Sequence, residues 1–220
     1  MINTKNEYNK RLSEIEIYFE TLELLDRGSC KIVCTDIINN ESYKEIDSNL
    51  STILKANGFL LLYNLVEATI RNSINAIFES VHLNNLSFKN LTCNLRKLWI
   101  KQEIKNIKYE DIFNLSNKIL NDELLLFKAE CINVSGNIDA QKIRNIARQF
   151  GYQESIDGRD LITIKDKRNK LSHGEFTFSE IGKDYTVNEL INFKNNTKDY
   201  LDNVLINIEQ YINSKGYKVV

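Results

Sequence analysis

The chain of 220 residues contains no proline and only eight glycines. Proline interrupts helices because its ring clashes with the preceding turn and its nitrogen has no hydrogen to donate, and glycine favours turns. A chain with so few of both has few forced breaks. The composition therefore favours long helices over a turn-rich β architecture, and we expect an all-α fold.

Apolar residues recur at three- and four-residue spacing along most of the chain, which is the period of an amphipathic helix. The pattern predicts helices over residues 5–26, 51–81, 87–104, 110–128 (broken near Asn121), 139–150 and 158–173. A capping box from Thr186 to Glu189 predicts the start of a final helix that reaches Tyr211. The stretch 51–81 is apolar around most of its circumference, so we expect a buried central helix. We expect irregular structure around Cys30 and Cys34, loop or short strand at 130–137, and a loop at 175–185.

The bulk charge excludes a generally cationic protein. The formal net charge is −1 and the sequence pI is about 6.2, so any contact with nucleic acid must come from a local basic patch or a symmetric interface. The four cysteines form no C-x-x-C pair and are interpreted as reduced structural thiols.

The sequence shows neither a recognisable signal peptide nor an obvious transmembrane segment. Its first seven residues are polar, unlike a signal peptide, and the longest apolar run, 59–66, is interrupted by Asn64 and is too short to span a bilayer. We therefore expect a soluble, cytoplasmic protein.

The most chemically suggestive segment is Arg168-Asn169-Lys170-Leu171-Ser172-His173, at the end of a predicted helix. His173 is one of only two histidines, the side chains that titrate near neutral pH. Arginine carries a permanent charge and a planar fork that matches phosphate oxygens. On an ideal helix Arg168 and His173 lie about 140° apart. They can therefore flank one cleft only if the helix end deforms or a second copy of the chain contributes.

Helical spacing places polar residues on one side of the predicted central helix. Asn64, Glu67, Arg71 and Asn75 follow one another along an otherwise apolar cylinder. A charge buried alone is strongly unfavourable, so Glu67 and Arg71 should pair at i,i+4 or meet partners elsewhere. The simplest hypothesis is that this polar seam faces the predicted helix 158–173, which carries the motif, and that Glu67 binds Arg168. A purely structural Glu–Arg link remains the alternative.

The motif from Arg168 to His173 resembles the R-N-x-x-x-H signature of the HEPN superfamily. Three stretches resemble its MAE-like branch more closely: 59–78 with the Asn-x-x-Glu-x-x-x-Arg seam, 137–151, and 165–190. The resemblance covers about residues 53–211. It implies a HEPN-type helical bundle over 51–220 with an additional N-terminal helical extension over 1–50, and a homodimer in which the motifs of two protomers form one cleft.

The same resemblance implies a metal-independent endoribonuclease without a cofactor, acting as a toxin or in phage defence. Its catalytic residues would be Arg168, His173 and Asn169. Glu67, Arg71 and Asn64 would support them, and Lys165, Lys167 and Lys170 would attract the RNA backbone. A solvated lysine face is the alternative for the last three. By analogy with the family, the resemblance also implies a cognate antitoxin as a partner.

Two other functions stay open at this stage. Some HEPN proteins lack activity and bind only nucleotides or proteins. If this chain is such a noncatalytic module, Arg168 and His173 contact phosphate without cleaving RNA. A DNA-binding regulator is the second alternative, because residues 139–151, with Lys142, Arg144 and Arg148, loosely resemble part of a helix-turn-helix. The near-neutral charge and the long connection through Gly158 argue against it.

Overall fold

The computed structural model describes residues 1–28, 30–35, 41–104, 109–128, 132, 134 and 136–219. These residues form two compact units. The motif unit comprises residues 8–66 and 159–198, and the large unit comprises residues 1–7, 67–158 and 199–220. Cys131 and most of the segment 130–135, interpreted above as loop or strand, lie outside the described residues.

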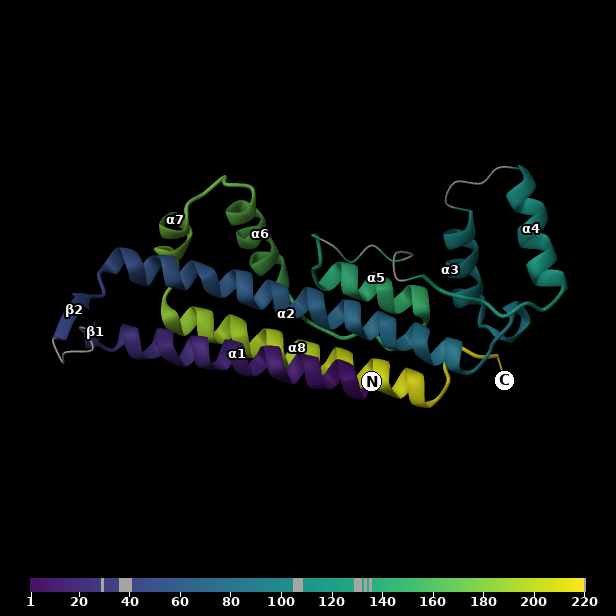
Figure 1. Ribbon diagram of the computed structural model, residues 1–220, viewed down its shortest axis with the longest axis horizontal. Helices are drawn as coiled ribbons and strands as arrows, with labels where there is room; N and C mark the ends of the chain where they lie inside the picture. Colours follow the sequence, from purple (N-terminus) through teal and green to yellow (C-terminus); the bar gives the residue numbers. More distant parts are fainter. Residues whose placement is uncertain are drawn as a thin grey trace. The chain divides into compact units, whose positions relative to one another are not determined.

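Helices account for nearly all the regular structure, which confirms the all-α fold (Figure 1). They are α1 (Ile2–Asp26), α2 (Ser48–Leu83), α3 (Cys93–Glu103), α4 (Tyr109–Leu120), α5 (Ala140–Phe150), α6 (Asp160–Ser172), α7 (Phe178–Gly182) and α8 (Val187–Asn213), with a 3-10 turn at Phe88–Asn90 and strands β1 (Lys31–Thr35) and β2 (Glu41–Glu45). Helix α4 ends at Leu120, close to the expected break, but the prediction of further helix up to residue 128 was wrong, because residues 121–128 form a turn and an extended segment with a β-bridge from Leu124 to Ser87. The capping box of Thr186 and Glu189 starts α8 as expected.

The motif unit is built around the first half of α2. Phe59 of α2 is fully buried and contacts the rings of Tyr185 and Phe193, at centroid distances of 4.9 and 5.7 Å. Gly58 lies against the ring of Phe19 from α1, and an added Cβ there would come within 3.3 Å of that ring. The apolar periodicity of α1 and α2 is thus used to pack the two helices together, and the hairpin, α6, α7 and the first part of α8 also belong to this unit.

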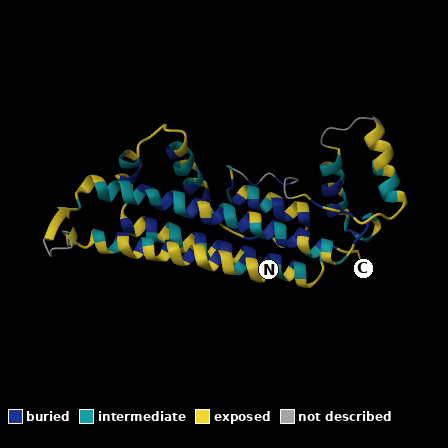
Figure 2. Cartoon of the chain, viewed as in Figure 1, coloured by how far each residue is buried: buried dark blue, intermediate teal, exposed yellow. Residues whose placement is uncertain are grey.

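The large unit has an aromatic core. Phe78 of α2 stacks on Phe127 and also contacts Phe150 of α5, and Tyr211 of α8 donates a hydrogen bond of 2.9 Å to the Phe150 carbonyl. Helix α5 covers nearly the predicted range 139–150, and it begins where Asp139 accepts a hydrogen bond of 2.8 Å from the Lys142 amide. Figure 2 shows the resulting alternation of buried and exposed residues along the long helices.

Two predictions of irregular structure were wrong. The stretch with Cys30 and Cys34 contains an antiparallel hairpin, in which β1 pairs with β2 from Lys31↔Glu45 to Thr35↔Glu41. All ten of its strand residues are exposed, so no buried face gave the sequence a strong strand signal. The predicted loop at 175–185 contains α7, whose capping box of Thr177 and Glu180 has the same chemistry as the one that starts α8.

Although the longest apolar run considered above, residues 59–66, is too short to cross a membrane, helix α2 as a whole could do so by length and composition. Half of its most apolar window is buried inside the fold. That is the behaviour of the core helix of a soluble helical domain, which satisfies the same length and composition test.

Candidate active site at the end of α6

Helix α6 places the motif arginine among buried apolar residues. Leu161, Ile164 and Leu171 are 2%, 1% and 8% exposed, and they form one buried apolar stripe at the spacing expected of an amphipathic helix. Arg168 lies on this stripe and is half-buried. A guanidinium is tolerated at such a position only when its donors and its charge have partners.

Two described contacts hold the guanidinium of Arg168. Its Cζ lies 4.4 Å from the ring centroid of Tyr63, a residue of α2 that is 1% exposed. Its Nη1 donates a hydrogen bond of 2.9 Å to Oδ1 of Asn169. Because arginine can only donate, the amide of Asn169 must present its oxygen to it. Asn169 therefore orients Arg168.

A glycine turn fixes the end of α6 and with it the position of His173. Gly174 has a φ of +70°, which is the left-handed region. Its amide donates to the Leu171 carbonyl at 3.2 Å, and the Glu175 amide donates to the Lys170 carbonyl at 3.0 Å. This pair of bonds is a Schellman motif, which ends the helix sharply. His173 is the C-cap residue and its side chain is exposed.

The end of α6 keeps its helical geometry up to the histidine. The His173 amide donates to the Asn169 carbonyl at 2.9 Å, the usual i to i−4 bond, with φ −90° and ψ −3°. The angle of about 140° between Arg168 and His173 on an ideal helix therefore persists. Of the two conditions stated above for a shared cleft, deformation of the helix end is not observed.

The motif lysines do not form a simple solvated face. Each of the three is half-buried. Lys167 lies 5.5 Å above the ring of Tyr185, and Lys170 lies 5.4 Å above the ring of Phe176 and pairs with Asp166 at 3.0 Å. These aromatic partners were not identified from sequence, because they follow the motif in a segment that was predicted to be loop.

The polar seam on α2 is more exposed than expected. Asn64 and Arg71 are exposed, so the seam is a surface strip along the helix and not a buried channel. Glu67 and Arg71 form the predicted i,i+4 ion pair, with side chains 18% and 50% exposed. Glu67 also accepts a hydrogen bond of 3.3 Å from the Gly136 amide, which links α2 to the segment before α5. These contacts favour a structural role, and the contact of Glu67 with Arg168 stays a prediction.

The second histidine has a structural role in the large unit. Nε2 of His82, near the end of α2, accepts a hydrogen bond of 2.8 Å from the Phe127 amide. This bond ties the segment that follows α4 to the last turn of α2, so His82 has a structural partner away from the motif.

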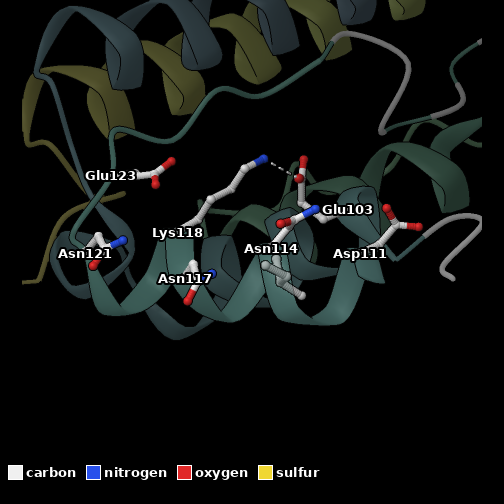
Figure 3. A pocket seen from close by; sticks show the side chains of 8 residues that line it. Glu103, Asp111, Asn114, Asn117, Lys118, Asn121 and Glu123 are labelled. Atoms are coloured by element: carbon white, nitrogen blue, oxygen red, sulfur yellow. Dashed lines mark hydrogen bonds and ion pairs between the residues drawn. The ribbon is translucent and has the colours of Figure 1, made fainter. Parts of the chain in front are cut away.

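A polar pocket of about 540 Å³ lies between α3 and α4 in the large unit (Figure 3). Asn114, Asn117 and Asn121 line it, and Lys118 reaches across to Glu103 at 3.0 Å. Its lining also includes Asp111 and Glu123, so carboxylates outnumber cations. That charge is wrong for a phosphate backbone. In the described part of the chain, no three His, Cys, Asp or Glu side chains gather closely enough to hold a metal ion.

A comparison with protein families matches the model of the MAE_28990-like HEPN family over residues 3–217. The chain belongs to this HEPN family. The match includes α1, which the motif resemblance alone did not reach. Comparisons with curated proteins and with solved structures found no match. Membership supports a ribonuclease or a nucleotide-binding module as the broad functional class of this HEPN protein. The division at residue 50 stays a prediction.

Proposed function

We propose that this HEPN protein is a metal-independent endoribonuclease that uses the ribose 2′-hydroxyl as the nucleophile. The observation that carries the proposal is the end of α6, where a guanidinium oriented by Tyr63 and Asn169 shares one helix terminus with an exposed imidazole. RNA supplies its own nucleophile, so the protein needs to provide only proton transfer and charge stabilisation.

The proposed reaction is a transesterification. His173 accepts the proton of the 2′-hydroxyl, the 2′-oxygen forms a bond to phosphorus, and the bond from phosphorus to the 5′-oxygen breaks. The leaving 5′-oxygen takes a proton from an acid. Arg168 stabilises the negative charge that develops on the phosphoryl oxygens. The products are a 2′,3′-cyclic phosphate and a 5′-hydroxyl.

The geometry of α6 favours a composite site formed by two copies of the chain. One imidazole cannot serve as base and acid in the same step, and Arg168 and His173 point to different sides of the helix end. In a homodimer, His173 of the partner subunit serves as the acid and the two motif helices flank one phosphate. Lys165, Lys167 and Lys170 attract the RNA backbone.

The first experiment compares wild-type protein with His173→Ala and Arg168→Ala on total RNA. We expect each substitution to lower the cleavage rate at least about 100-fold. Arg27→Ala is the matched control, because Arg27 is an exposed arginine directly after α1 whose guanidinium pairs with Glu23 at 2.6 Å. Far-UV circular dichroism verifies that each variant is folded.

Cleavage that survives either motif substitution, or that disappears on addition of EDTA, contradicts the proposal. Wild-type protein that binds nucleotides tightly without cleaving RNA points to the noncatalytic HEPN module. By analogy with the family, the activity serves a cytoplasmic toxin or phage-defence system, and a cognate antitoxin is the expected partner. Growth inhibition by the wild type, but not by His173→Ala, tests this cellular role.

A further inference from the structure

The turn that ends α6 also exposes an aromatic ring close to His173. Phe176 follows His173 by three residues, so their Cα atoms are at most about 11 Å apart. The residue is 45% exposed. The Schellman turn at Gly174 folds the chain back, so that Phe176 lies beside Lys170 of the last helical turn.

A cation lies over one face of this ring, and nearly half of the residue's surface is open to solvent. The ammonium of Lys170 lies 5.4 Å from the ring centroid and is also paired with Asp166 at 3.0 Å. A cation over one face holds the ring in a defined orientation. A fixed aromatic ring with an open face is the platform on which unpaired nucleobases stack.

The charge around the ring suits RNA better than a second protein surface. Residues 165–176 carry four cations, at 165, 167, 168 and 170, against carboxylates at 166 and 175. The whole chain has a net charge of −1, so this segment is a local basic patch on a near-neutral protein. Basic side chains interleaved with an exposed aromatic ring characterise sites for single-stranded nucleic acid.

We propose that Phe176 stacks on a nucleobase next to the scissile phosphate and makes the protein selective for single-stranded RNA. This inference rests on the proposed ribonuclease function and adds a substrate-binding residue to it. Phe176 takes no part in proton transfer. A duplex offers no open base face to the ring, so stacking discriminates against it, whereas backbone contacts from the lysines do not.

The test measures RNA binding in the His173→Ala background, so that the RNA stays intact. The probes are a fluorescein-labelled single-stranded RNA of mixed sequence and the same RNA annealed to its complement. Fluorescence anisotropy gives each Kd. We expect Phe176→Ala to weaken binding of the single strand about 5- to 150-fold, the range for loss of one stacked base. Phe176→Trp should retain binding, and duplex binding should change less than about two-fold.

Phe113→Ala is the matched control, because Phe113 is a 66% exposed phenylalanine on α4, outside the motif unit. Single-strand binding by Phe176→Ala equal to that of the background protein overturns the inference, as does an equal loss on single strand and duplex. A shift of Phe176→Ala from dimer to monomer in light scattering assigns the ring to a protein interface and overturns it as well. Absence of any RNA binding or cleavage by every variant, wild type included, instead contradicts the proposed function itself.

Discussion

Replacing Gly174 tests whether the left-handed turn after α6 is required for stability and for the site. The Cβ of an alanine would meet no atom within 4 Å, so the substitution costs no packing. Its cost comes from the backbone, because φ is +70° and an L-residue with a Cβ pays about 1–2 kcal/mol in that region. Asparagine tolerates the same conformation better than alanine does. The free energy of unfolding should therefore fall in the order Gly, Asn, Ala.

Urea unfolding followed by circular dichroism measures this effect. With an m value of about 2 kcal/mol/M, the midpoint of Gly174→Ala should fall by about 0.5–1 M. Gly28→Ala is the control, because Gly28 also faces open space and its φ lies outside the left-handed region. The cleavage rate adds a second readout, since the two Schellman bonds position His173 and Phe176. If Gly174→Ala matches the wild type in both stability and rate, the reasoning about this turn is wrong.

Three further predictions follow from described contacts. An alanine Cβ at Gly182 of α7 would lie 1.8 Å from the Thr52 carbonyl oxygen of α2. Gly182→Ala should therefore lower the free energy of unfolding, measured in urea, by at least about 1–3 kcal/mol. An unchanged free energy of unfolding contradicts this close approach of the two helices. Tyr63→Leu removes the ring beneath Arg168 and should lower the rate constant of RNA cleavage about 2- to 30-fold. Tyr63→Phe keeps a ring and should lower the rate constant less. If the two variants lose the same activity, the contact between the ring and Arg168 does not contribute to cleavage. Burial raises the pKa of Tyr200 to about 12, and its hydroxyl has no hydrogen-bond partner among the described residues. The unfolded chain loses this proton first, so the unfolding free energy should fall as pH rises from about 10 to about 12. Tyr200→Phe should reduce that fall, as urea titrations at pH 8 and pH 11 can measure.

The sequence predicted the helices because each has a strong local signal. The apolar stripe of α6, the Asp139 cap of α5 and the Thr186–Glu189 capping box all act within a few residues. The hairpin was missed because its exposed strands have no buried face to impose alternation. α7 was missed although its own T-x-x-E box is visible in the sequence, because the helix has only five residues.

The candidate site was only partly predictable for a similar reason. Arg168, Asn169 and His173 lie within six residues of one another, and the angles between them around the helix could be assigned from helical periodicity. Tyr63 lies about a hundred residues earlier, and only tertiary packing brings its ring under Arg168. The i,i+4 pair of Glu67 and Arg71 could be predicted from spacing, whereas the surface position of their strip could not, because it depends on which neighbours cover α2.

Each unit is assembled from separate stretches of the chain, and α1, α2 and α8 all pass from one unit to the other. No single cut can release either unit as an intact fragment. Excising residues 67–158 to isolate the motif would sever α2 in mid-helix and leave the two halves of the motif unit to find each other without their natural connection. A deletion variant of this protein would therefore lose activity because it is misfolded, whether or not the deleted residues take part in the function. Point substitutions are the appropriate tool for locating the functional residues.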